Sequence, residues 1–85
     1  MSFEVTISDE AQSDINGRPS SVQEAICTTL REDLAERPGE VGVSLAGPPA
    51  GLRSLQRGSQ ASSYRIVYQV LQQEVRVLHV YGPGH

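Results

Sequence analysis

Apolar and polar residues alternate near both ends of the chain, which is the pattern of half-buried β-strands. Phe3, Val5 and Ile7 alternate with polar residues over the first eight positions, and this period of two predicts a strand. Residues 63–71 and 74–81 are rich in aromatic and β-branched residues and predict two further strands. The Gln72-Gln73 reversal between them would make an antiparallel hairpin. A shorter strand is expected from Leu52 through Arg57.

Two helices are expected between the first strand and the others. Ser8 or Asp9 can cap a short helix, which the Asn16-Gly17-Arg18-Pro19 segment ends. The second helix has a capping-box pattern from Ser21 to Glu24 and ends at Pro38-Gly39. Its apolar residues recur every four positions and form one stripe: Val22, Ile26, Leu30 and Leu34.

The predicted order is β-α-α-β-β-β in a single domain over residues 1–85. Segregated helices and strands indicate an α+β fold with an antiparallel sheet, in which both helices cover one face. The other face would be open. If Ile66, Tyr68 and Val70 face the helices, then Arg65, Val67 and Gln69 face the open side.

Composition places the chain among small globular domains. Of its 85 residues 38% are hydrophobic, and no apolar run has the length of a membrane span. No signal peptide is recognisable, and Cys27 is the only cysteine, which excludes an internal disulfide. We therefore expect a protein of the reducing cytoplasm with no membrane partner and no cysteine-based zinc site. No cofactor is expected.

The net charge of −3 conceals two halves of opposite sign. Residues 1–50 contain three arginines and nine acidic residues, whereas residues 51–85 contain four arginines and one acidic residue. The two halves thus carry −6 and +3. There is no lysine, so every fixed positive side chain is a guanidinium, a group suited to bidentate contact with phosphate. The second half is therefore the candidate for binding an anion.

Three segments of the chain resemble the RelE/ParE superfamily of bacterial type II toxins. They are the opening Phe3–Ala11, the middle segment from Leu45 to Leu55, and the closing hairpin Tyr64–Val70 with Val75–Val80. The resemblance covers nearly the whole chain, and the hairpin, which favours the RelE branch, is its most specific part. It implies two helices on a small curved antiparallel sheet.

The resemblance also implies a function. RelE-branch toxins cut messenger RNA in the ribosomal A site without a metal ion, because the ribose 2′-hydroxyl attacks its own phosphodiester. ParE-branch toxins inhibit DNA gyrase instead. Members of both branches are neutralised by a cognate antitoxin. The leading interpretation is therefore a cytoplasmic, metal-independent mRNA endonuclease that acts on the ribosome with its bound mRNA.

The resemblance and the residue chemistry together nominate six site residues. Arg65 matches the family's strand arginine and is expected to stabilise the extra negative charge of a pentacoordinate phosphate. His85 resembles a histidine that follows the last strand in many members, and Tyr81 could stack on a base or place its hydroxyl near the phosphate. Arg53, Arg57 and Arg76 are the RNA-binding candidates. His79 is expected to pack within the last strand.

Two other functions stay open at this point. The second interpretation is a gyrase inhibitor, because segments around Arg53 and Arg76 also resemble the ParE branch. The third is an attenuated relative that only binds its antitoxin, since the chain is acidic overall and lacks lysine.

Overall fold

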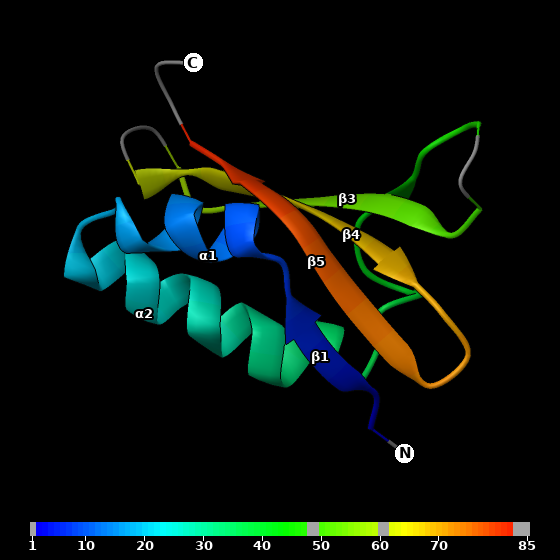
Figure 1. Ribbon diagram of the computed structural model, residues 1–85. Coiled ribbons are helices and arrows are strands. Elements are labelled where there is room, and N and C mark those ends of the chain that lie inside the picture. The colour runs from blue at the N-terminus through cyan, green and yellow to red at the C-terminus, as the bar shows by residue number, and fades with distance from the viewer. Residues whose placement is uncertain (1, 48–49, 60–61, 83–85) are drawn as a thin grey trace.

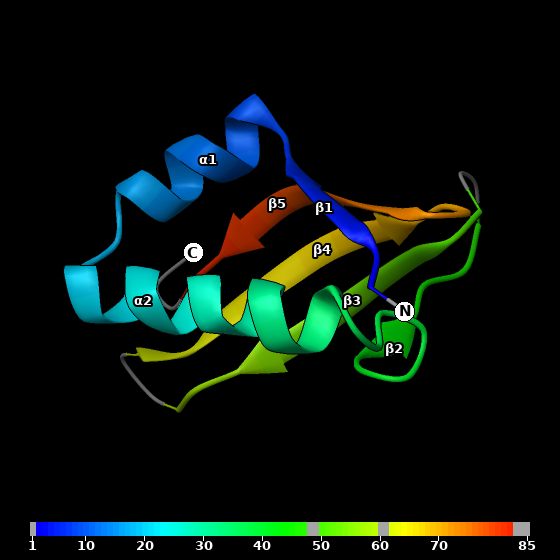
Figure 2. The same ribbon diagram turned by 90° about the horizontal axis from the view of Figure 1, so that it is seen from below.

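The computed structural model describes residues 2–47, 50–59 and 62–82 and places two helices on one side of a twisted sheet (Figure 1). The elements in chain order are β1 (Glu4–Ile7), α1 (Asp9–Asn16), α2 (Ser20–Thr29), the π-helical turn η1 (Leu30–Leu34), β2 (Val43–Ser44), β3 (Leu52–Arg57), β4 (Tyr64–Val70) and β5 (Glu74–Tyr81). Seen from below, both helices lie over the same face of the sheet (Figure 2). The predicted α+β class, with both helices on one face, is confirmed.

The sheet is mixed, and the expectation of a wholly antiparallel sheet is wrong in one pair. The strand order is β1-β5-β4-β3-β2, and β1 runs parallel to β5 whereas the other three pairs are antiparallel. A parallel pair needs a long crossover connection rather than a hairpin. Here the whole of the intervening chain, including both helices, supplies that connection.

The two helices begin in different ways. Ser8 caps α1 as expected, because its hydroxyl accepts a hydrogen bond of 3.1 Å from the Ala11 N–H. The capping box predicted from Ser21 to Glu24 is wrong. Helix α2 starts at Ser20 directly after Pro19, whose fixed φ already suits a helix start, and no side chain caps it.

One π-helical turn keeps the apolar stripe of the second helix facing the sheet. In an α-helix, a step of four residues rotates a side chain by about 40° beyond a full turn, so Val22 and Leu34 would drift apart. The wider turn η1, closed by a hydrogen bond from the Ala35 N–H to the Leu30 carbonyl, compensates for this drift. Leu30 and Leu34 are therefore both buried.

The core lies between the helices and the inner face of the sheet. Strand β4 contributes Tyr64, Ile66 and Tyr68, which are at most 4% exposed. The other buried apolar residues are Ala11, Ile15, Val22, Ile26, Leu30, Leu34, Val41, Leu55, Val75, Val77 and Val80. The opposite face of the sheet has no helix over it in the described part of the chain, and it carries the candidate site (Figure 1).

Candidate functional site

Strand β4 presents Arg65 on the open face of the sheet. Its residues alternate between buried and accessible from Tyr64 to Tyr68, so Arg65 points away from the helix layer as predicted. Across the described residues, no hydrogen bond or ion pair engages the Arg65 guanidinium. Its five donors are therefore available to a ligand.

A β-bulge in β5 decides which side chains stand beside Arg65. Val67 pairs with His79 whereas Tyr68 pairs with Val77, so Leu78 is an extra residue with no partner on β4. Without this residue, the alternation that buries Val77 would also turn His79 and Tyr81 inward. The bulge reverses the alternation, and His79 and Tyr81 consequently share the open face while Val80 is buried.

Arg65, Tyr81 and His79 thus form one cluster at the end of the open face. Tyr81 lies directly across from Arg65, which places their Cβ atoms about 5 Å apart, and His79 is the diagonal neighbour. The rings of His79 and Tyr81 stack with centroids 5.7 Å apart and planes inclined by 24°. Tyr81 remains 46% exposed. A cation, an imidazole and a phenol therefore lie on neighbouring positions of one accessible face.

Helix α1 holds the outer edge of β5 where β1 no longer pairs with it. The Ser8 hydroxyl donates a hydrogen bond of 2.8 Å to the carbonyl of Leu78, the bulged residue. Farther along, the Val80 N–H donates to the Asp14 carboxylate, and Arg18 donates to the Val80 carbonyl. These contacts fix the strand segment that carries His79 and Tyr81.

Arg76 also lies on the open face, but at the other end of the hairpin. It pairs with Gln69 of β4, four positions from Arg65, a separation of about 13 Å along the strand. Its guanidinium contacts Glu74 at 3.3 Å. A hydrogen bond from the Thr6 hydroxyl, supported by Arg76, lowers the pKa of Glu74. This end of the face is a neutralised pair rather than a free cation.

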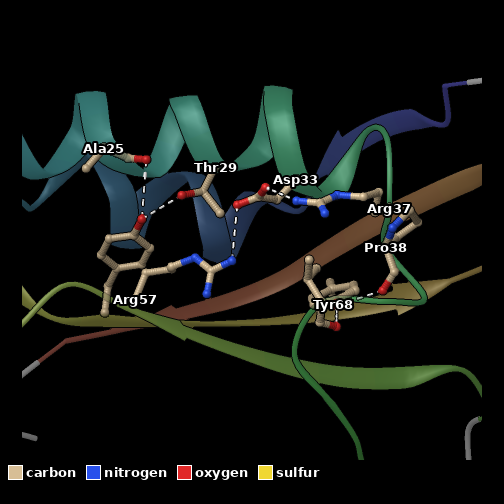
Figure 3. A network of polar contacts seen from close by, with 9 residues as sticks. Ala25, Thr29, Asp33, Arg37, Pro38, Arg57 and Tyr68 are labelled. Atoms are coloured by element: carbon tan, nitrogen blue, oxygen red, sulfur yellow. Dashed lines mark hydrogen bonds and ion pairs between the residues drawn. The ribbon is translucent and has the colours of Figure 1, made fainter.

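Arg53 lies on the helix-facing side of the sheet, opposite to Arg65. Its guanidinium donates to the carbonyls of Val41 and Gly42. The buried Tyr68 hydroxyl lies 2.9 Å from the carbonyls of Pro38 and Val41, so its hydrogen bonds also hold this loop (Figure 3). Burial raises the pKa of Tyr68, and the nearby Arg53 partly offsets this. Arg53 thus holds the loop that follows the second helix.

Arg57 shares that side of the sheet and contacts the second helix. It donates to the Asp33 carboxylate at 3.3 Å, and Asp33 also accepts from Arg37 at 3.2 Å (Figure 3). Nearby, Tyr64 and Thr29 share a buried hydrogen bond of 2.7 Å. The structure therefore places Arg65 and Tyr81 on neighbouring positions of the open face. Arg53 and Arg57 lie on the opposite side of the sheet, and Arg76 lies at the other end of the open face.

Three further points complete the inventory of the site. His85 lies outside the described residues. Among residues 2–47, 50–59 and 62–82, no three His, Cys, Asp or Glu side chains are grouped closely enough to hold a metal ion. In the same ranges no helix has the length and apolar content to cross a bilayer.

His79 is the site residue that strand periodicity alone misplaces. Strict alternation from Val75 and Val77 puts it inside the sheet, where packing is the natural expectation. The signal that could have found it is the pair Val77-Leu78, two adjacent apolar residues that interrupt an otherwise alternating strand. Such an interruption is typical of a β-bulge.

Comparison with known proteins identifies relatives of this fold. No protein-family model matches the sequence, and no curated protein matches it. Among solved structures, a chain of the toxin–antitoxin complex RelBE2 from Mycobacterium tuberculosis superposes with a TM-score of 0.84 at 26% identity, covering 96% of this chain and 99% of that one. A double mutant of the E. coli toxin RelE in the free state gives a TM-score of 0.79 at 26% identity and covers 99% and 86%. The chain is therefore similar, in fold and at 26% sequence identity, to toxins of the RelE branch of the RelE/ParE superfamily.

The similarity to RelE-branch toxins extends over both the helix layer and the sheet, since the alignments span almost all of this chain. A chain of the chromosomal ParDE system from P. aeruginosa aligns with a TM-score of 0.65 at 14% identity, over 94% of this chain and 95% of that one. That likeness shows the shared fold alone.

Proposed function

We propose that this chain is the toxin of a type II toxin–antitoxin pair and that it cleaves mRNA on the ribosome without a metal ion. Relatives at 26% identity include RelE itself and the toxin–antitoxin complex RelBE2. The observation that carries the proposal is the cluster on the open face. There a guanidinium without a protein partner in the described residues stands across from Tyr81 and diagonal to His79.

The reaction assigns Arg65 to the phosphate. The 2′-oxygen of the ribose attacks the adjacent phosphorus, the bond from phosphorus to the 5′-oxygen breaks, and the products are a 2′,3′-cyclic phosphate and a free 5′-hydroxyl. Negative charge increases on the phosphate oxygens in the pentacoordinate transition state. Arg65 can donate two parallel hydrogen bonds to them, and it is already in place before the charge develops.

The stacked pair supplies the proton transfers. Attack requires loss of the 2′-hydroxyl proton, and departure of the 5′-oxygen requires a proton in return. An imidazole can take up a proton and release it again, so His79 is assigned as the base that accepts the 2′-hydroxyl proton and later returns it to water. The Tyr81 hydroxyl, which lies nearer to Arg65 in the strand register, is assigned as the donor to the leaving oxygen and regains its proton from water.

The remaining arginines take supporting roles in this proposal. Arg53 anchors the loop after the second helix, and Arg57 contacts that helix through Asp33. Both lie on the side of the sheet away from Arg65. Arg76 lies on the open face, where more distant RNA phosphates would compete with Glu74 for its guanidinium. The partner in the cell is a cognate antitoxin, as in the RelB complexes of the relatives.

Ribosomes programmed with a defined mRNA test the proposal. Purified protein is added with and without EDTA, and the 5′ ends of the mRNA are mapped by primer extension. We expect new ends in the A-site codon, unaffected by EDTA and dependent on the ribosome. Arg65→Ala should reduce their formation about 100-fold or more, the usual effect of removing a transition-state donor.

Arg31→Ala is the matched control. Arg31 is an exposed arginine of η1 on the helix layer, and within the described ranges it also has no hydrogen bond or ion pair. Its loss changes the net charge equally and should leave cleavage unchanged. Equal loss in both variants, or full cleavage by folded Arg65→Ala, would contradict the assignment of Arg65. Intact mRNA with inhibited gyrase supercoiling would favour the ParE-type activity, and inactivity in both assays would favour a chain that only binds its antitoxin.

A further inference from the structure

Gln56, Arg65 and Tyr81 form a row across three strands on the open face of the sheet. Gln56 of β3 pairs with Arg65 of β4, and Arg65 pairs with Tyr81 of β5. Residues that lie directly across from each other share a face and bring their Cβ atoms within about 5 Å. Gln56 therefore flanks Arg65 on the side away from Tyr81.

The side-chain amide of Gln56 is available to a ligand. The residue is exposed, and among the described residues no hydrogen bond engages its side chain. Strand β2 leaves it uncovered, because that strand pairs with Ser54 and Arg53 and the chain turns away at Gly42, whose φ is +70°. An amide offers one acceptor and two N–H donors, so it can pair with two neighbouring atoms of a ligand.

A surface hollow of about 360 Å³ lies beside Gln56 and also has Arg65 in its lining. Its volume falls in the range of small-ligand sites. Val43 and Ser54 line it as well, and because they pair with each other they share the open face. Val43 is 63% exposed and gives the hollow an apolar surface. No acidic side chain of the described residues lines it, so a phosphate-linked ligand meets no like charge there.

The proposed reaction decides which nucleotide reaches this hollow. Tyr81 is assigned to the leaving 5′-oxygen, which belongs to the nucleotide on the 3′ side of the cut. Arg65 holds the phosphate, and Gln56 lies on its other side. The nucleotide on the 5′ side keeps its ribose next to the phosphate, because its own 2′-oxygen attacks there. Its base then extends over β3.

We propose that the hollow binds this base and that Gln56 selects adenine, which makes Gln56 a specificity-determining residue. Adenine presents the N7 acceptor beside the N6 amino donor, and a glutamine amide pairs with both. Guanine presents two acceptors on the same edge, and neither pyrimidine has this combination. Proteins read single-stranded RNA in this way, because an unstacked base exposes its edges. The inference rests on the proposed function, since that reaction sets the position of the cut.

Four mRNAs that differ only in the base immediately 5′ of the mapped cut test the inference on the ribosome. Wild-type protein should cleave the adenine mRNA at least about fivefold faster than the other three, the lower end of what one bidentate contact to a base provides. Replacing that adenine by 7-deazaadenine, which lacks the N7 acceptor, should remove the advantage. Equal rates on the four mRNAs, or an unchanged rate with 7-deazaadenine, would overturn the inference.

Substitutions of Gln56 should change the base preference in a defined direction. Gln56→Ala should cleave the four mRNAs at similar rates. Gln56→Glu should prefer cytosine instead, because a carboxylate accepts from the cytosine N4 amino group and cannot donate to N7. Gln72→Ala is the matched control, since Gln72 is exposed in the turn between β4 and β5, at the other end of the hairpin from Arg65, and it should keep the adenine preference. An adenine preference that survives in folded Gln56→Ala would contradict the assignment.

Binding of two dinucleotides separates this inference from the proposed function. The probes are 2′-deoxyadenosine and 2′-deoxycytidine, each joined through a 3′-phosphate to guanosine, and neither has the 2′-hydroxyl that cleavage requires. The adenine probe should shift the side-chain amide resonances of Gln56 in NMR spectra and bind at least about fivefold more tightly than the cytosine probe. If mRNA stays intact but this difference is found, the proposed function fails and the base site stands. If mRNA is cleaved and the two probes bind equally or leave Gln56 unchanged, the base site alone is wrong.

Discussion

Asp33 and Arg57 join the helix layer to the edge of the sheet through a single hydrogen bond of 3.3 Å (Figure 3). The Asp33 carboxylate belongs to the π-helical turn, and it also contacts Arg37 four residues later. The side chain of Arg57 is 43% exposed, so water screens this contact. The pair therefore orients Arg57 more than it stabilises the fold.

Asp33→Asn should consequently have a small effect on stability. We expect a loss of about 0.5–1 kcal/mol in the free energy of unfolding, because exposed ion pairs contribute in this range. Urea denaturation at low and high salt measures it, and the difference between wild type and variant should shrink at high salt. Since Arg57 is assigned away from the reacting phosphate, mRNA cleavage should change less than threefold.

Tyr68→Phe should cost more than its small size change suggests. The Tyr68 hydroxyl is buried, and it is a partner of the Pro38 and Val41 carbonyls. Leaving buried carbonyls short of a donor costs about 1–3 kcal/mol in the free energy of unfolding. Chemical denaturation checks this value. Tyr81→Phe, on the open face, serves as the control and should leave stability within about 0.5 kcal/mol.

Ser8→Ala should affect both stability and the site. Its hydroxyl caps α1 and donates to the carbonyl of the bulged Leu78. Loss of a helix cap costs about 1 kcal/mol, and release of the bulge should lower mRNA cleavage as well. Ser20→Ala is the comparison, because Ser20 begins α2 without capping it. Equal effects of the two substitutions on cleavage would contradict a role for Ser8 in holding the bulge.

The hydrogen bond from Thr6 to Glu74 makes the folding stability depend on pH, with a sign that follows from the lowered pKa of Glu74. The Thr6 hydroxyl is the main cause that lowers the pKa of Glu74 below its ordinary value of 4.5. A lowered pKa in the folded state adds stability above the unfolded value, and this stability disappears as the pH falls through the folded value. In Thr6→Val the Glu74 pKa should rise toward 4.5, which a carboxyl NMR titration would detect. An unchanged titration would assign the shift to Arg76 instead.

His79→Gln tests the assigned base through the rate of cleavage and its chemical rescue. The folded variant should cleave about 100-fold more slowly or worse, because a positioned general base contributes about 100- to 10,000-fold to a rate. Free imidazole should partly restore the rate of His79→Ala, because it can take the place of the missing side chain. Cleavage by folded His79→Gln at the wild-type rate would show that His79 only supports Tyr81.

The sequence pattern predicted those features of the fold that depend on residues close together in the chain. The alternation in β4 placed Arg65 on the open face because each side chain of a regular strand follows from the one before it. The parallel pairing of β1 with β5 could not be predicted this way, since its partners are about 70 positions apart. The side of the sheet on which Arg53 and Arg57 lie could have been predicted, because Leu55 between them is buried and alternation puts all three on one face.

The pairing of β1 with β5 also bears on how a cell makes this protein. Among the described strands β1 pairs with β5 alone, and Arg65 of β4 faces Tyr81 of β5 across the β4–β5 pairing. Synthesis proceeds from the N-terminus at about 5–20 residues per second, so β1 and β4 are both made before their partner β5. The sheet therefore closes after translation of β5 rather than during it. A nascent chain carries Arg65 without Tyr81 or His79 beside it, and the ribosome that builds this protein is not exposed to the assembled site until the last strand has been made.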